Sequence, residues 1–99
     1  MNYRFHPGAL QEYAEATHYY AEMPSSLAAG FVTRIESGIN QILITPQAWQ
    51  PIAEDVRRCL VKRFPFGIYY TIEDDNAVLL LAIMHLSRKP GYWQARTSK

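Results

Sequence analysis

Four cations lie within seven residues in the second half of the chain. They are the basic members of Arg57-Arg58-Cys59-Leu60-Val61-Lys62-Arg63. On a strand, Arg58 and Lys62 would share one face, and Arg57 and Arg63 the other. Such a concentration of charge is costly unless it stays in water or meets an anion. The pattern indicates either a docking strip for phosphates or an acidic peptide, or an edge strand whose cations prevent aggregation.

A second group of reactive side chains follows a long apolar run. It is the segment His85-Leu86-Ser87-Arg88-Lys89-Pro90-Gly91-Tyr92-Trp93. His85 titrates near neutrality and could act as an acid or a base, and Arg88 could stabilise charge on a phosphate. Tyr92 or Trp93 could stack on a base. The structural alternative is that His85 hydrogen-bonds locally and Trp93 packs against the sheet edge.

Other kinds of site have little support. His6, His18 and His85 lack the spacing of metal ligands, and no glycine-rich phosphate loop is present, so we expect neither a metal nor a cofactor. The single cysteine, Cys59, excludes an internal disulfide. We interpret it as a small core residue, although Arg58 and Lys62 nearby could lower its pKa.

A strand and two helices are predicted in the first half. Tyr3–His6 is a short strand that ends at Pro7-Gly8. The next segment is helical, and its apolar positions, which we expect to face the core, are Leu10, Tyr13, Ala14, Thr17 and Ala21. Pro24 ends this helix. Because the turn that follows is short, the two helices must form an antiparallel hairpin.

The second helix has the clearer pattern. Ser25 or Ser26 can cap its start, and it should reach about Ile44 and end before Pro46. Its apolar positions step by four, four, four and three residues and are Leu27, Phe31, Ile35, Ile39 and Ile42.

Strand periodicity follows a loop, Pro46–Pro51, in which Trp49 is expected to lie over the core. The predicted strands are Arg58–Phe64, a half-buried strand over Ile68–Glu73, and Ala77–Met84, which is apolar on both faces and therefore central. Phe64–Gly67 is the expected turn between the first two. These three strands should form a meander. The fold class is α+β, with an N-terminal strand and an antiparallel helical hairpin packed on a small, mainly antiparallel sheet.

Composition fits one globular domain over residues 1–99. The chain has 99 residues, 48% of them hydrophobic, with 10 basic and 9 acidic side chains. Residues 1–50 hold two basic and four acidic side chains, and residues 51–99 hold eight and five, so the cations concentrate in the second half. No stretch has the pattern of a signal peptide or the roughly 20 apolar residues of a membrane span. We expect a cytoplasmic protein with no membrane contact.

Three features together resemble the RelE/ParE superfamily of bacterial toxins from type II toxin–antitoxin systems. They are the basic strand running into Phe64-Pro65-Phe66, the Ile68-Tyr69-Tyr70 strand before an acidic turn, and the buried strand that ends in His85 and is followed by Arg88 and Pro90. The helix around Ala14–Tyr20 also looks like the first helix of the family. The resemblance covers roughly residues 3–93.

This resemblance implies a small toxin of the plasmid-stabilisation type, held inactive by a cognate antitoxin whose acidic tail folds on binding. RelE-type members cleave mRNA on the ribosome without a metal, through Lys and Arg side chains of the middle strands and an Arg and a Tyr near the C-terminus. ParE-type members lack most of these residues and poison DNA gyrase. Here Lys62, Arg63 and Arg88 persist, but Gly67 and Ile68 stand where RelE types carry an Arg. The pattern is therefore closer to ParE.

Three hypotheses follow from the resemblance. In the first, the protein inhibits gyrase and is no enzyme, and the residues that bind target or antitoxin are Arg58, Lys62, Arg63, Arg88, Lys89, Tyr92 and Trp93. In the second, it is a ribosome-dependent ribonuclease, with Arg63, His85, Arg88 and Tyr92 as catalytic residues. In the third, it is a degenerate, non-toxic module that only binds an antitoxin.

Overall fold

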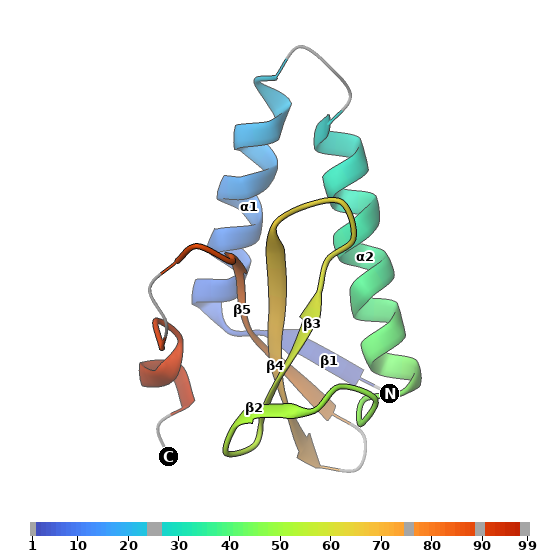
Figure 1. The fold of residues 1–99 in the computed structure, drawn as a ribbon, viewed down its shortest axis with the longest axis vertical. Coiled ribbons are helices and arrows are strands. Elements are labelled where there is room, and N and C mark those ends of the chain that lie inside the picture. The colour runs from blue at the N-terminus through green and yellow to red at the C-terminus, as the bar shows by residue number, and fades with distance from the viewer. Residues whose placement is uncertain (1, 24–26, 75–76, 89–90, 98–99) are drawn as a thin grey trace.

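Two helices pack on one face of a five-stranded sheet (Figure 1). The computed structural model describes residues 2–23, 27–74, 77–88 and 91–97. Its elements are β1 (Asn2–Phe5), α1 (Pro7–Ala21), α2 (Leu27–Ile44), β2 (Pro51–Ala53), β3 (Val56–Leu60), β4 (Phe66–Asp74), β5 (Ala77–His85) and the short 3-10 helix η1 (Gln94–Thr97). The α+β class and the mainly antiparallel sheet are confirmed.

The sheet has the order β1-β5-β4-β3-β2. The predicted meander is confirmed, because β3 pairs antiparallel with β4 and β4 with β5. β1 pairs parallel with the first half of β5, from Asn2 opposite Ala77 to Phe5 opposite Leu80. β2 was not predicted as a strand, and its first residue, Pro51, was predicted as the end of a loop. In the structure β2 pairs with the start of β3.

α1 begins earlier than predicted, since Pro7 and Gly8 lie in its first turn. Proline suits this position, where its missing N–H has no helical partner. His6 caps the helix, and its Nδ1 accepts a hydrogen bond from the Gly8 N–H at 2.9 Å. The predicted cap of α2 at Ser25 or Ser26 lies outside the described residues.

α2 presents the predicted face to the core. Phe31, Ile35, Ile39 and Ile42 are buried, although Leu27 is exposed. Gly38 allows the helix to approach β4 closely, since a Cβ there would lie 2.8 Å from Cδ1 of Ile68. The end of the helix at Ile44, before Pro46, is as predicted.

The predicted core face of α1 was correct at Tyr13 but not at most of its other positions. Leu10, Ala14 and Ala21 are exposed. The stripe that packs on the sheet is instead Ala9, Tyr13, Ala16 and Tyr20. Tyrosine rings replace aliphatic side chains in this contact, with the Tyr20 and Phe31 ring centroids 5.1 Å apart.

The turn between β3 and β4 also differs from the prediction. β3 ends at Leu60, so Lys62 and Arg63 lie in the turn, and Phe66 and Gly67 belong to β4. Arg63 has a φ of 71°, in the left-handed region, and the strand alternation therefore ends before it.

The two faces of the sheet carry separate cores. The face toward the helices holds the larger one, which includes Ile68, Tyr70 and Ile83 with partly buried Trp49, as predicted, against it. The opposite face holds Val56, Tyr69, Leu81, Ala82, Met84 and Trp93. A bulge at Leu81, where Tyr69 pairs with Ala82 and Tyr70 with Leu80, reverses the alternation along β5. As a result Ile83, three residues after Leu80, still faces the helices.

Candidate functional site

One end of the sheet brings together both groups of cations. Phe66 pairs with His85, and Leu86 N–H donates to Pro65 O at 2.8 Å. The β3–β4 turn, which carries Lys62 and Arg63, therefore lies beside the segment that carries His85 and Arg88. Residues separated by more than 20 positions in the sequence thus lie at the same end of the sheet.

The basic side chains of this end are distributed over two faces. Arg58 is the register partner of Tyr69, which belongs to the core opposite the helices. His85 lies on the helix side, with its ring 5.4 Å from that of Phe66. Since the sheet separates them, Arg58 and His85 do not converge on a common centre.

Gly67 places no side chain beside Arg58 on the face of the sheet opposite the helices. A Cβ at Gly67 would lie 3.2 Å from Cγ and Cδ of Arg58 and 3.1 Å from Cε1 of Tyr69. The aliphatic part of the Arg58 side chain therefore lies in the space that a side chain at position 67 would need. An arginine at position 67, as expected for RelE types, would have to displace the Arg58 side chain.

His85 makes local hydrogen bonds. Its Nδ1 accepts from the Ser87 N–H at 3.1 Å and lies 2.7 Å from Ser87 Oγ. Nδ1 is therefore an acceptor, and a neutral ring carries its proton on Nε2. His85 and Arg88 both line a cavity of about 400 Å³ between α1 and the end of β5, together with Tyr20 and Phe66.

Tyr92 lies between two arginines. Cζ of Arg88 is 4.6 Å from the centre of the Tyr92 ring, and Cζ of Arg96 is 5.2 Å from it. Both distances suit cation–π contact. Tyr92 is exposed, so this cluster presents an aromatic ring and the Arg88 guanidinium together at the surface.

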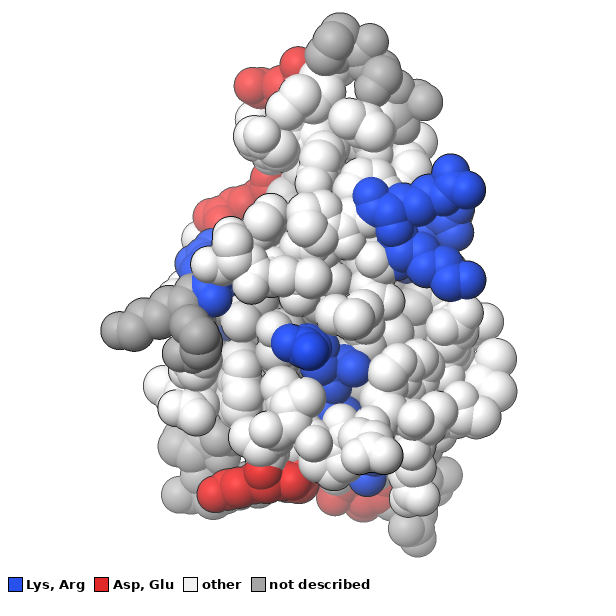
Figure 2. Space-filling model, viewed as in Figure 1, with Lys and Arg blue, Asp and Glu red and all other residues white. Residues whose placement is uncertain are grey.

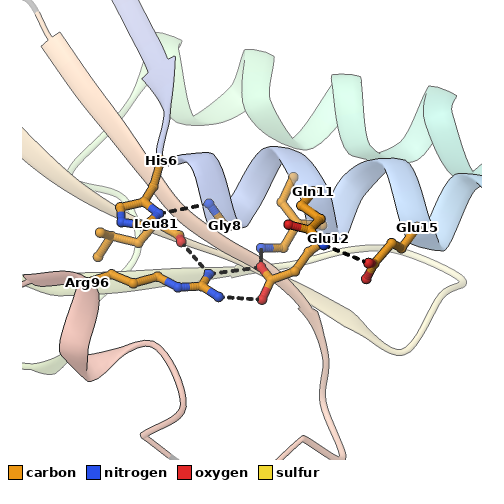
Figure 3. A network of polar contacts seen from close by, with 8 residues as sticks. His6, Gly8, Gln11, Glu12, Glu15, Leu81 and Arg96 are labelled. Carbon is orange, nitrogen blue, oxygen red and sulfur yellow. Dashed lines mark hydrogen bonds and ion pairs between the residues drawn. The ribbon is translucent and has the colours of Figure 1, made fainter.

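Arg96 in turn holds the C-terminal segment on the fold (Figure 3). Its Nη2 lies 2.9 Å from Glu12 Oε2, and its Nη1 donates to Glu12 Oε1 at 3.1 Å and to Leu81 O at 2.9 Å. Glu12 Oε1 also accepts from the Ile83 N–H at 3.0 Å. β1 ends before this part of β5, so the two side chains satisfy the strand edge that β1 leaves unpaired.

Sequence reasoning missed this pair. Glu12 and Arg96 are 84 residues apart, and neither belongs to a motif. An acidic residue within an otherwise amphipathic helix was the one available signal.

Trp93 is buried, with 6% of its surface exposed, and its ring lies 6.0 Å from that of Tyr69. Packing on the sheet therefore occupies the indole, which agrees with the structural alternative stated for Trp93. Of the two aromatic candidates, only Tyr92 has an accessible ring. Lys89 lies outside the described residues.

Cys59 is a core residue, as interpreted from the sequence. Burial raises the pKa of its thiol to about 11. The expectation that Arg58 and Lys62 could lower this pKa is wrong, because desolvation disfavours the thiolate. Burial likewise raises the pKa of Tyr70 to about 12, and the Tyr70 hydroxyl donates to Pro46 O at 2.6 Å.

The described residues contain no group of three His, Cys, Asp or Glu side chains arranged to hold a metal ion. None of the helices in the same part of the chain has the length and apolar character needed to cross a membrane.

The chain was compared with known proteins. Residues 3–90 match the family model described as ParE toxin of type II toxin-antitoxin system, parDE. A comparison with curated proteins gave no match.

Among solved structures, the fold is similar to one described as the chromosomal ParDE TA system from P. aeruginosa. That similarity has a TM-score of 0.70 and 18% identity, over 86% of this chain and 95% of the other. The isolated E. coli RelE toxin is similar with a TM-score of 0.59 and 15% identity, over 96% of this chain and 94% of the other. The chain belongs to the ParE toxin family of type II toxin–antitoxin systems.

Proposed function

We propose that this protein is a toxin that inhibits DNA gyrase and is neutralised by a cognate antitoxin. The match of residues 3–90 to the ParE toxin family carries the proposal, because the family is defined by toxins of parDE systems. The incomplete set of cations supports it. A metal-independent ribonuclease needs several fixed cations around one phosphate, whereas Gly67 and Ile68 occupy the positions where RelE types are expected to carry an arginine.

The surface of α1 supports an antitoxin contact. An apolar strip on this helix is lined by Leu10, Tyr13, Ala14, Thr17, His18 and Ala21. It forms a shallow hollow of about 510 Å³, and Leu10 is 53% exposed. An amphipathic helix of the antitoxin would cover this α1 apolar strip, as helices cover apolar grooves elsewhere.

The cations support an acidic region in the same partner. Among the described residues, Lys62 and Arg63 make no ion pair. Figure 2 shows basic side chains gathered beside α2 and the β3–β4 turn, away from the acidic side chains at the other end of the sheet. A segment rich in Asp and Glu would meet these charges there.

A supercoiling assay tests the gyrase proposal. Purified protein should inhibit the supercoiling of relaxed plasmid by gyrase, and the purified antitoxin should restore it. In cells, induced expression should stop DNA synthesis before translation. Growth arrest with unaffected gyrase would contradict the proposal.

A second candidate function is a RelE-like ribonuclease acting on translated mRNA in the ribosome. One observation favours it, namely that His85 and Arg88 line the same cavity. Primer extension on translated mRNA decides the matter, since this candidate requires toxin-dependent cuts within codons. Harmless expression without antitoxin would instead identify a non-toxic module that only binds its partner.

A further inference from the structure

Among the described residues, no strand covers the outer edge of the C-terminal half of β5. β1 ends at Phe5, opposite Leu80, so β5 continues beyond its parallel neighbour. α1 lies beside this edge, and the space between them is the cavity of about 400 Å³ that His85 and Arg88 line. We call it the α1–β5 cavity. Its size lies within the range of about 300–1,000 Å³ that is typical of small-molecule sites.

The register of β5 decides which of its polar backbone groups face this cavity. Leu86 N–H donates to Pro65 O at 2.8 Å, so these two residues form a hydrogen-bonded pair at the end of the β4–β5 ladder. Hydrogen-bonded and non-hydrogen-bonded pairs alternate along antiparallel strands, and the pairs that contain His85 and Ile83 are therefore of the second kind. The N–H and C=O groups of Ile83 and His85 thus point away from β4, toward α1.

Two of these four groups already have partners. Ile83 N–H donates to Glu12 Oε1 at 3.0 Å, and His85 C=O accepts from Arg88 N–H at 3.0 Å. Within the described part of the chain, the Ile83 C=O and the His85 N–H have no hydrogen-bond partner. A carbonyl and the N–H two residues after it are the groups that one residue of a parallel strand would bond. The edge therefore offers one acceptor and one donor, spaced for the amino and carboxyl groups of a single amino acid.

Charged side chains give the cavity a polarity. Glu12 and Glu15 line it from α1, and Arg96 neutralises Glu12, so Glu15 carries the remaining negative charge. At the end of β5, Arg88 lines the cavity and makes no ion pair with another described residue. A ligand that carries one cationic and one anionic group matches this arrangement.

Much of the remaining wall is aromatic. Tyr19, Tyr20 and Phe66 line the cavity, and Met23 lies beside them. The ring centroids of Tyr20 and Phe66 are 6.2 Å apart in an edge-to-face arrangement. Aromatic rings favour edge-to-face and offset contacts with one another, and this wall therefore suits a planar aromatic side chain.

We infer that the α1–β5 cavity binds a free α-amino acid with an aromatic side chain. Its ammonium group donates to the Ile83 C=O, with Glu15 as the opposite charge. Its carboxylate accepts from the His85 N–H and from the Arg88 guanidinium, and its ring lies against the aromatic wall. The inference goes beyond the proposed function and does not depend on it, since neither gyrase nor an antitoxin takes part.

The first test is a titration with L-phenylalanine followed by NMR. The amide resonances of Met84 and His85 should shift together, because the Ile83 carbonyl and the Met84 N–H belong to one peptide group. N-acetylphenylalanine and phenylalaninamide each lack one charge of the ligand and should each bind about tenfold more weakly. Equal binding of N-acetylphenylalaninamide, which lacks both charges, would overturn the inference, since an apolar hollow would then account for the shifts.

Two variants at one residue test the backbone donor. His85→Ala keeps the N–H and His85→Pro lacks it, so the proline variant should bind phenylalanine about tenfold more weakly than the alanine variant. The ladder to β4 does not use this N–H, and proline is tolerated where the N–H faces away from the sheet. Circular dichroism shows whether both variants fold, and equal affinities of two folded variants would overturn the inference. If the proline variant does not fold, the capped ligands decide on the unchanged protein.

Charge variants test the two ends of the ligand. Arg88→Gln should weaken phenylalanine binding about tenfold, and Glu15→Gln about threefold, because Glu15 is exposed and its charge is screened by water. The matched control is Arg34→Gln, which removes the same charge from α2, outside the cavity, and should leave binding unchanged. Equal weakening by Arg34→Gln would contradict a specific site. So would a Gly-Phe-Gly peptide, capped at both ends, that shifts the same amides more strongly than phenylalanine.

Discussion

The two helices of the hairpin use their apolar side chains in different ways. α2 directs Phe31, Ile35, Ile39 and Ile42 into the core. α1 contributes Ala9 and the rings of Tyr13 and Tyr20, and leaves Leu10 in solvent. An apolar stripe on a helix therefore identifies the core face only where the helix carries no second such stripe. On α1 the stripe that contains Tyr13 and Tyr20 packs on the sheet, and Leu10 and Ala14 stay exposed.

The largest effect is expected on α2. Phe31→Ala should lower the free energy of unfolding by about 3–5 kcal/mol, because a fully buried ring is lost and leaves a cavity. The ring lies among those of Tyr13, Tyr20, Phe64 and Phe66. Urea unfolding followed by circular dichroism measures the change. Leu10→Ala on α1 is the control, and an equal loss there would refute the contrast between the helices.

The next largest effect is expected at the polar position of α1. Glu12→Ala should cost about 2–3 kcal/mol, since it leaves the Arg96 charge and the Ile83 N–H without their partner. The side chains of Glu12 and Arg96 are only 9% and 14% exposed. The control is Glu15→Ala, whose carboxylate is exposed on the same helix. If the two variants unfold at the same urea concentration, the pair does not anchor the C-terminal segment.

A smaller, pH-dependent effect is expected between the helices. The Tyr13 hydroxyl donates to Glu36 Oε2 at 2.9 Å, and burial, followed by this carboxylate, raises the pKa of Tyr13 above its ordinary value of 10.0. A raised pKa stabilises the fold fully below pH 10 and less as the pH rises beyond it. Tyr13→Phe should therefore cost about 1–2 kcal/mol at pH 8 and less at pH 11.

Unfolding at both pH values tests this difference. Tyr19→Phe, at an exposed ring on the same helix, should show neither the loss nor its pH dependence. A cost for Tyr13→Phe that stays constant from pH 8 to pH 11 would mean that the hydroxyl does not link the helices in this way.

The smallest effect on stability is expected in the α1 apolar strip. Leu10→Ser should change the unfolding free energy by no more than about 0.5 kcal/mol, as surface substitutions do. It should nevertheless weaken antitoxin binding about tenfold in calorimetry, because the exposed side chain is assigned to the interface. Ile44→Ser, at an exposed residue of α2 outside the strip, should leave binding unchanged. If both variants bind the antitoxin equally well, the α1 apolar strip is not part of the interface.

Much of the fold could be predicted from periodicity. The apolar spacing of α2 and the continuous apolar run of β5 describe elements that bury one face or both, and each was placed correctly. The helix α1 was also predicted, but its core face was correct at Tyr13 and not at Leu10, because hydrophobic periodicity does not rank tyrosine against leucine. The bounds of the β3–β4 turn were predicted incorrectly because Arg63 adopts a left-handed backbone conformation, which an arginine in the sequence does not indicate.

The candidate site was predictable only in its composition. The cationic segments could be found as runs of charge. The face of the sheet on which each cation lies could not be predicted. The sequence left Trp93 open between a target contact and packing on the sheet, and its burial against Tyr69 favours the packing. The only sequence signal for Glu12 was its acidic side chain within an amphipathic helix, and its partner Arg96 lies 84 residues away.

By itself, the sequence determined the order of the elements, the identity of the core of α2 and the family of the protein, because these depend on local spacing and on motifs. Only the tertiary structure decided which face of the sheet each functional side chain occupies. The bulge at Leu81 turns His85 toward the helices, and Arg96 closes the β5 edge against Glu12. Both depend on pairing between segments far apart in the chain, where a shift of one residue exchanges the two faces of a strand.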